Sequence, residues 1–351
     1  MLSTLPPEIL RIVFANIDDK NALCNLSITS RQFRELAEPL LYARIAFPAS
    51  SSSTLKVTRL ESLLQALEAS SGRRAPYVHA ISFAATSSRT GEPGLIDKIL
   101  AKTINLKSLK LYSLSGSSLK GHTFQHNPVF TLTVLHMSST HLHKDQDMLD
   151  FLESQASLET LHLTRSRHLE NKPEFLSTSF PNLKTLFIHA SLVHPFLRTS
   201  ARLERLCVTG RANWPNSRPG NAIFTDSIRT LSCLRLSSAE LAIFMASLFP
   251  NLEWLSGPIT TANLDELCTH NRNLRGILLT GPASAGFSQD EANQFFDTIP
   301  SLRFVEYPQP ESHNRFYRWY RGAAAPTLVR WLCELGEEWL ADWIEDVVHV
   351  E

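Results

Sequence analysis

Two glycine-rich stretches come nearest to known catalytic or ligand-binding motifs. Residues 116–121 (GSSLKG) have the two glycines of a phosphate-binding loop, but His122 and Thr123 follow where a Lys and a Ser or Thr would have to reach the phosphates and magnesium. Residues 281–286 (GPASAG) place a serine between two glycines, one residue away from the spacing of a nucleophile elbow. We therefore expect both stretches to be loops without catalytic chemistry.

Metal ligands and basic patches are equally sparse. His141, His143 and Asp145 could approach a metal ion, but one short His-x-His pair without a second cluster is more typical of a solvated loop. Basic residues gather at 73–74 and 165–168 without the aromatic interleaving of a nucleic-acid surface. The sequence indicates no catalytic residue, no metal site and no cofactor. We expect a protein that is not an enzyme; an enzyme built into a repeat fold is an alternative that an acidic or nucleophilic pocket would favour.

Composition narrows the class of partner. The 351 residues include 34 Lys and Arg and 34 Asp and Glu, so no net charge draws the chain to nucleic acid or to an anionic membrane. The five cysteines are widely spaced and never form a Cys-x-x-Cys pair, unlike a disulfide framework or a zinc knuckle. We expect neither a signal peptide nor a membrane span. These features favour a soluble protein of the cytoplasm or nucleus with protein partners.

The first 47 residues predict three short helices. Leu5-Pro6-Pro7-Glu8 suits a helix start, because prolines are tolerated in the first turn and Glu8 complements the helix dipole. Asp18 or Asp19 can cap a second helix, and Ser30 a third. A module of this size has little interior, so some of its apolar side chains should contact a partner. The apolar positions that we expect to be shared between the module's core and such a contact are Leu5, Pro6, Ile9, Val13, Phe14, Ile17 and Leu26.

These residues carry a family resemblance. The string LPPEIL at 5–10, followed by SRQFRELAEPLLY at 30–42, resembles the F-box, over residues 3 to about 46. With the repeats described next, the chain resembles fungal-type F-box proteins that have a C-terminal leucine-rich-repeat-like domain. The resemblance implies that the module docks onto a Skp-type adaptor, which ties it to the cullin scaffold of a ubiquitin ligase. The seven apolar residues above would then be the adaptor-binding residues.

Beyond a small-polar stretch at 49–54, the frame Leu-x-x-Leu-x-Leu recurs along the chain. Its ten complete or degenerate copies begin at Val78, Leu106, Leu132, Leu158, Leu183, Leu203, Leu231, Leu252, Leu274 and Leu302. They are about 25 residues apart, which lies within the period of about 20 to 29 residues of leucine-rich repeats. Single copies would mean little because leucine is common, but near-constant spacing indicates a repeat array.

The segments between the frames predict helices. Pro181, Pro250 and Pro300 stand just before a frame, where each would stop a helix. Apolar residues have helical spacing at 94–104, 146–156, 238–249 and 288–299, with possible capping boxes at Ser237 and Ser288. We therefore predict an α/β fold, in which a three-helix F-box precedes a leucine-rich-repeat solenoid, a horseshoe with parallel strands on its concave face and helices outside.

The C-terminal part of the chain predicts one more helical element. From Pro326, apolar residues recur at i, i+3, i+4 and i+7, which predicts a helix or broken pair of helices that caps the last repeat, or else a partner-binding helix. The predicted domains are an F-box at 1–47, a linker with an N-terminal capping helix at 48–77, the solenoid at 78–310 and a C-terminal helical cap at 311–351.

Side chains between the frame leucines should point to solvent on the concave face, because strand side chains alternate. The expected target-binding residues there are Lys110, Tyr112, His136, His162, Phe187, His189, Arg205, Arg235, Trp254 and Phe304. Basic groups can bind carboxylate or phosphate, so an acidic or phosphorylated peptide is one expected ligand, and a merely solvated face is the alternative.

Together these features predict the substrate-recognition subunit of a Skp-cullin-F-box ubiquitin ligase, with an unidentified target protein on the repeats. The alternative is a repeat scaffold without a ligase role, whose N-terminal helices cap the solenoid or bind a different partner.

Overall fold

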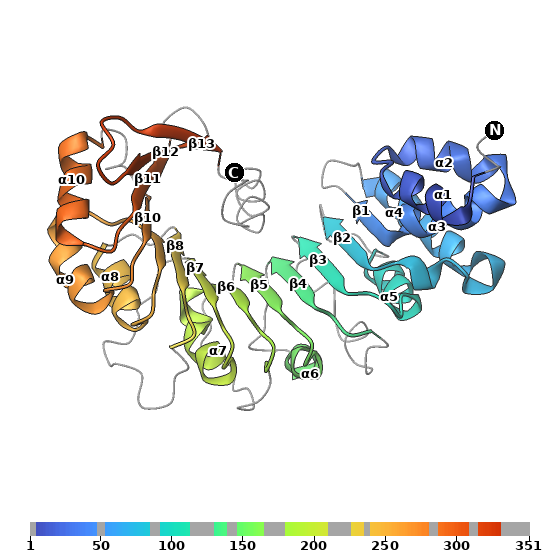
Figure 1. Cartoon of the computed structure of the whole chain (residues 1–351). Helices are drawn as coiled ribbons and strands as arrows, with labels where there is room; N and C mark the ends of the chain where they lie inside the picture. The colour runs from blue at the N-terminus through green and yellow to red at the C-terminus, as the bar shows by residue number, and fades with distance from the viewer. Residues whose placement is uncertain are drawn as a thin grey trace. The chain divides into compact units, whose positions relative to one another are not determined.

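The computed structural model describes residues 5–47, 53–84, 92–112, 130–138, 146–164, 180–209, 226–234, 239–280, 287–308 and 315–330. The chain divides into two compact units, Met1–Leu183 and Lys184–Glu351. In each unit, helices lie along one side of a sheet of strands (Figure 1).

The first unit begins with three short helices, as predicted. They are α1 (Pro7–Ala15), α2 (Lys20–Thr29) and α3 (Arg31–Ala43). The Asp19 carboxylate accepts a hydrogen bond from Asn21 N, and Ser30 Oγ accepts one from Phe33 N, so both helices have the side-chain caps that their sequences indicate. The three helices enclose a small core of their own, formed by Leu10, Phe14, Leu23, Phe33 and Ala37.

The sheet of the first unit starts earlier than the repeats of the sequence suggested. Strand β1 (Arg44–Phe47) follows α3 directly and pairs in parallel with β2 (Ala80–Ala84). Ile45 lies opposite Ile81 and Phe47 opposite Phe83, and the two Phe rings stack with centroids 5.4 Å apart. The last residues of the helical module are thus also the first strand of the sheet.

The other described elements of this unit are further parallel strands and the helices that precede some of them. Strands β3 (Ser108–Tyr112), β4 (Val134–Ser138) and β5 (Thr160–Thr164) continue the parallel order from β2. Helix α4 (Ser53–Glu68), followed by the short 3-10 turns η2 (Ala69–Gly72) and η3 (Ala75–Tyr77), lies between β1 and β2. Helix α5 (Glu92–Lys102) lies between β2 and β3, and α6 (Gln146–Ser154) between β4 and β5.

The second unit repeats this arrangement. Its parallel strands are β6 (Thr185–His189), β7 (Arg205–Thr209), β8 (Thr230–Leu234), β9 (Trp254–Gly257), β10 (Gly276–Leu279) and β11 (Phe304–Pro308). Its helices are η5 (Ala190–Leu192), α7 (Val193–Thr199), α8 (Ala239–Ser247), η6 (Thr261–Asn263), α9 (Leu264–His270) and α10 (Gln289–Thr298). The capping box predicted at Ser288 is confirmed, because Ser288 Oγ accepts from Glu291 N and the Glu291 carboxylate accepts from Ser288 N. The box predicted at Ser237 lies outside the described residues.

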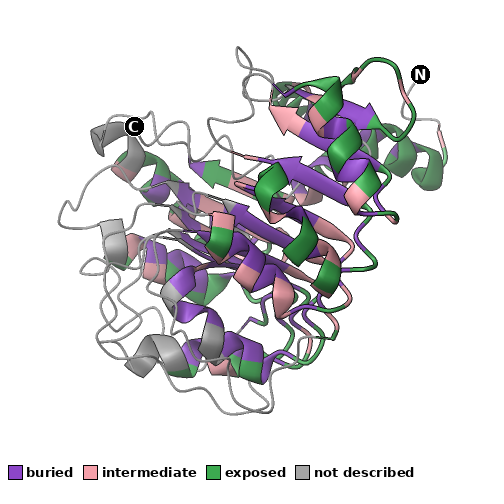
Figure 2. Cartoon of the chain, turned by 90° about the vertical axis from the view of Figure 1, so that its left-hand side faces the viewer, coloured by how far each residue is buried: buried purple, intermediate pink, exposed green. Residues whose placement is uncertain are grey.

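The repeated leucine frame corresponds to the register of the sheet, because residues at the same frame position lie opposite each other on neighbouring strands. In-register partners such as Leu135 and Leu161, or Leu206 and Leu231, come from the same position of successive frames, and these side chains are fully buried. Buried residues are concentrated on the strands, whereas the helices also carry exposed positions (Figure 2). These features confirm an N-terminal helical module followed by a leucine-rich-repeat-like sheet.

One frame was placed three residues too late. The prediction took Leu231, Leu234 and Leu236 as frame leucines, but Leu231 pairs with Leu206 and Cys233 with Val208. The frame is therefore Ile228, Leu231 and Cys233, all three fully buried. A leucine three residues on offered an equally good pattern, and only the pairing with β7 distinguishes the two.

The predicted C-terminal helical cap is wrong for its first part. Residues 315–330 form β12 (Arg315–Tyr320) and β13 (Thr327–Arg330), which are antiparallel additions to β11. Four of the six residues of β12 are aromatic, and aromatic residues are enriched in strands. Residues 331–351, which hold most of the apolar stripe, lie outside the described residues.

Candidate functional site

Helix α1 has an apolar surface that its own module does not bury. Ile9, Ile12 and Val13 are 45 %, 61 % and 42 % exposed, and their i, i+3, i+4 spacing puts them on one face of the helix. Leu10 and Phe14 lie on a different face, within the core. We call Ile9, Ile12 and Val13 the α1 surface.

The seven predicted adaptor residues divide between this surface and the core. Pro6, Ile9 and Val13 are exposed. Phe14 is 3 % exposed and contacts Phe33 with ring centroids 5.4 Å apart, so its place is in the core. The other three, which are Leu5, Ile17 and Leu26, are partly buried against that core.

Two large exposed apolar residues in the described part of the helical module were not among the predicted adaptor residues. Ile12 completes the α1 surface, and Ile28, near the end of α2, is 76 % exposed. The signal for Ile12 was present, since it lies three residues after Ile9, but the sequence does not show which apolar face of α1 turns inward.

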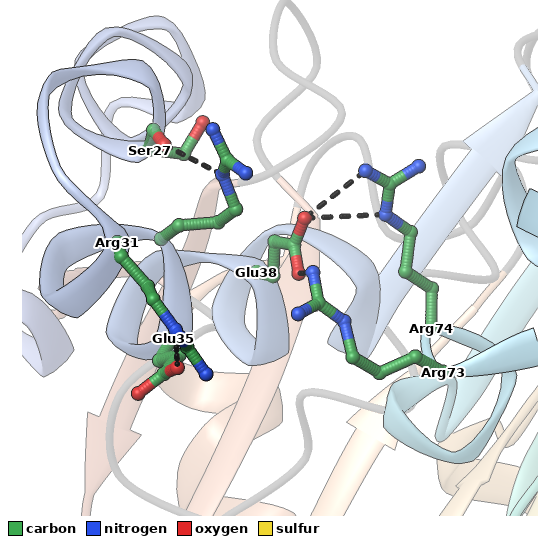
Figure 3. Close-up of polar contacts among 7 residues, drawn as sticks. Ser27, Arg31, Glu35, Glu38, Arg73 and Arg74 are labelled. Carbon is green, nitrogen blue, oxygen red and sulfur yellow. Dashed lines mark hydrogen bonds and ion pairs between the residues drawn. The ribbon is translucent and has the colours of Figure 1, made fainter. Parts of the chain in front are cut away.

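A buried carboxylate joins the helical module to the segment before β2. Glu38 of α3 is 5 % exposed, and its two oxygens accept hydrogen bonds from two arginines (Figure 3). Arg73 donates from Nη2 at 2.5 Å, and Arg74 donates from Nε and Nη2 at 3.2 and 3.1 Å. Arg74 also lies over the Tyr42 ring, 5.5 Å from its centroid. Arg73 and Arg74, a basic patch in the sequence, are thus a structural clamp.

On the strand face of the first unit, three predicted target residues lie in register. Lys110, His136 and His162 occupy corresponding positions on β3, β4 and β5. The two imidazole rings meet edge to face with centroids 5.0 Å apart and are 9 % and 6 % exposed. Tyr112 ends β3.

The pKa values of both histidines are lowered. Burial, with a smaller effect of Lys110, lowers the pKa of His136 from 6.5 to about 3. Burial, His136 and Lys110 lower the pKa of His162 in the same direction. Both rings are therefore neutral at pH 7, so this buried pair adds no positive charge to the strand face.

In the second unit, aromatic side chains gather over β9, β10 and β11. The rings of Trp254 and Phe304 lie 5.1 Å apart across Gly276 of the intervening strand. A Cβ atom at Gly276 would lie 2.4 Å from the Trp254 ring and 2.8 Å from the Phe304 ring, so only glycine allows both rings to lie there. Of the other predicted residues, Phe187 is 2 % exposed, and His189 and Arg205 are partly exposed.

Arg235 lies outside the described residues, and the corrected frame gives its expected position to Ser232, which lies opposite Cys207.

An ion pair beside these rings was not predicted. Arg318 of β12 binds Glu306 of β11, with Nε 2.6 Å from Oε1, and both side chains are almost fully buried. The guanidinium lies 4.4 Å from the Phe304 ring centroid and 5.7 Å from that of Tyr320. Sequence reasoning missed the pair because it assigned residues 311–351 to a helical cap.

Among the described residues, no group of three or more His, Cys, Asp or Glu could hold a metal ion. The motif-like stretches at 116–121, 141–145 and 281–286 lie outside the described ranges, as does the basic patch at 165–168. In the part of the chain that is described, no helix combines the length and the apolar character needed to cross a bilayer.

Comparison with known proteins agrees with the helical module. Residues 2–48 match the F-box-like family model. No curated protein matches the chain. Among solved structures, the leucine-rich repeat-containing protein LegL7 from Legionella pneumophila is similar over 90 % of this chain and 95 % of its own, with 14 % identity and a TM-score of 0.44.

Proposed function

We propose that this chain, with an F-box-like module at residues 2–48 and a leucine-rich-repeat-like sheet, is the substrate-recognition subunit of a Skp-cullin-F-box ubiquitin ligase. F-box domains generally bind Skp-type adaptors, and the two parts together are typical of protein-interaction adaptors without catalysis of their own. Such a subunit acts in the cytoplasm or nucleus, where the ligase machinery is found.

The α1 surface carries the adaptor half of the proposal. The module already has its own core, yet Ile9, Ile12 and Val13 remain exposed beside it. Burying an Ile or Val side chain contributes about 1.5–3 kcal/mol, so three adjacent ones can supply much of a protein contact. A helix that only capped the sheet would not need this exposed apolar face.

The clamp at Glu38 supports action by proximity. A ligase receptor must hold its target at a defined distance from the conjugating enzyme, because shared attachment raises the effective concentration of the target. The pairing of β1 with β2 and the Glu38–Arg73–Arg74 clamp tie the F-box-like module firmly to the sheet of the first unit.

The strand faces carry the target half, each unit by itself. The first unit offers the Lys110 ammonium beside the two neutral histidines, and the second unit offers the Trp254–Phe304 rings; basic and aromatic side chains are usual anchors of protein interfaces. The alternative is a repeat scaffold that does not bind the adaptor.

The experiment that separates the two measures binding of purified Skp-type adaptor to the full chain and to Ile9→Asp plus Val13→Asp. We expect binding by the natural chain and a loss of at least about 100-fold in the variant, because two buried contacts are replaced by charges. Arg11→Asp, on another face of the same helix, is the matched control and should bind normally. A folded natural chain that does not bind adaptor would leave the scaffold alternative.

A further inference from the structure

Three arginines stand side by side at one edge of the sheet in the second unit. Arg275 and Arg303 directly precede β10 and β11, and Arg321 directly follows the antiparallel strand β12, which neighbours β11 (Figure 1). Backbone hydrogen bonds join them in this order, because Arg303 N donates to Arg275 O at 2.8 Å and Arg321 N donates to Arg303 O at 3.1 Å. All three residues are exposed. We call them the arginine row.

The arginine row by itself is unfavourable for the fold. Charges of the same sign that lie opposite each other on neighbouring strands repel. Further along the same edge the corresponding positions alternate in sign, with Arg229 between Glu204 and Glu253. The turns that carry the arginine row contain no Asp or Glu; they are residues 271–276, 299–304 and 320–325. Such a row is expected where a partner supplies the missing negative charge.

The middle arginine of the row is available for a partner. Glu253 lies 3.3 Å from Arg275, and Arg321 donates from Nη2 to two carbonyls at the end of α10 at 2.7 and 2.8 Å. The side chain of Arg303 between them has no hydrogen bond or ion pair with any described residue. Its planar guanidinium has five N–H donors whose geometry matches a carboxylate. Arg303 can therefore bind a carboxylate without breaking a contact of the fold.

Aromatic rings border the arginine row on the strand face. Phe304 directly follows Arg303, and its ring lies 5.1 Å from that of Trp254 and 6.2 Å from that of Tyr320. Phe304 is 8 % exposed, but Tyr320 is 40 % exposed and Trp254 is partly exposed, so a partner can reach the two outer rings. Arg, Trp and Tyr are the residue types that most often anchor protein interfaces.

We propose that the arginine row and these three rings form a docking surface for an acidic segment of a partner protein. The carboxylates of the segment bind the guanidinium groups, and an aromatic side chain of the segment packs on Trp254 and Tyr320. Naming this partner as the ligase target rests on the proposed function, whereas the binding of an acidic segment does not.

Two single substitutions on this edge test the docking surface, because they reverse the same charge in opposite surroundings. Arg303→Glu places a carboxylate between two arginines, and Arg229→Glu places one between two glutamates. Binding of the full chain is measured by fluorescence polarisation of a labelled short peptide with Glu residues around a central Phe. The salt concentration is about 0.1 M, at which exposed charges more than about 10 Å apart are largely screened.

We expect Arg303→Glu to weaken peptide binding at least about tenfold, because a charge-assisted contact becomes a repulsive one. Arg229→Glu should weaken it less than about twofold, since three strand spacings, about 14 Å, separate Arg229 from Arg303.

Urea unfolding of the same proteins separates binding from folding. Arg303→Glu should keep or raise the free energy of unfolding, because attraction to its two neighbours replaces repulsion. Arg229→Glu should lower it for the opposite reason. The variant that binds the peptide worse is thus expected to be the more stable one, which a merely structural role of Arg303 would not give.

The docking surface is overturned if the folded natural chain does not bind the peptide, if a copy of the peptide with Gln in place of Glu binds equally well, or if both variants weaken binding equally. A lower stability of Arg303→Glu than of Arg229→Glu would show that the row stabilises the fold, and also overturns it. Displacement of the peptide by single-stranded RNA at a lower concentration than by unlabelled peptide would assign the surface to nucleic acid instead. Because no adaptor is present, failure here is distinct from failure of the proposed ligase role.

Discussion

In both units, buried ion pairs should contribute more to the free energy of unfolding than exposed ion pairs do. Glu38 accepts three hydrogen bonds from two arginines, and Arg318 and Glu306 pair beside two aromatic rings. Exposed pairs such as Arg31 with Glu35 contribute little, because solvent screens them. The consequences of single substitutions should follow this distinction.

Glu38→Ala should lower the free energy of unfolding by about 2 kcal/mol. The loss is moderate because Arg73 and Arg74 are partly exposed and regain water when the carboxylate is removed. Urea unfolding of the full chain measures it. Glu35→Ala, which removes a solvent-exposed carboxylate of the same helix, should cost less than about 0.5 kcal/mol. Equal losses in the two variants would show that the clamp adds nothing.

His136 should make the chain less stable in mild acid. Its pKa is about 3 in the folded chain and about 6.5 in the unfolded chain. Below pH 6.5 the unfolded chain therefore binds a proton at this ring while the folded chain does not, which lowers the free energy of unfolding. Between pH 7 and pH 5 this costs about 2 kcal/mol. His136→Gln should remove that part of the pH dependence in urea unfolding. An unchanged slope would argue against a buried, neutral His136.

At the scale of elements, the strand register matters more than any one leucine. Parallel pairing places residues of successive repeats side by side, so a substitution on one strand acts on its two neighbours. Gly276 is the clearest case, since it leaves room for rings that come from β9 and β11. The requirement for glycine at this position therefore comes from the two neighbouring strands as well as from β10 itself.

Gly276→Ala should lower the free energy of unfolding by about 1–3 kcal/mol, because the new methyl group displaces Trp254 and Phe304. A change in tryptophan fluorescence of the folded chain should accompany the loss. Gly94→Ala is the matched control, since a Cβ there meets nothing within 4 Å, and it should be neutral or slightly stabilising. A Gly276→Ala chain as stable as this control would contradict the described packing.

At the scale of the whole molecule, some substitutions should abolish adaptor binding without changing the free energy of unfolding, while others should change both. Phe14 lies in the module's core and Ile12 on the α1 surface, two residues apart on one helix. The core residue should affect both properties, and the surface residue only one.

Phe14→Ala should destabilise the F-box-like module by about 3–4 kcal/mol and abolish adaptor binding through unfolding. Ile12→Asp should abolish binding while the circular dichroism spectrum and the unfolding midpoint stay as in the natural chain. Both are measured on the full chain, by adaptor pull-down and by urea unfolding. Retained binding in Ile12→Asp would remove the α1 surface from the adaptor contact.

The sequence by itself determined the helical module, its caps at Asp19 and Ser30, and the repeat of strand and helix, because these depend on local spacing and capping chemistry. Only the tertiary structure decided which apolar face of α1 is buried, where the β8 frame lies, and that residues 315–330 are strands. Each of these depends on contacts between residues far apart in the chain. The leucines near β8 fit two registers equally well, and only pairing with the neighbouring strand distinguishes them. Helix α1 is apolar on more than one face, and only its packing against α2 and α3 decides which face is buried.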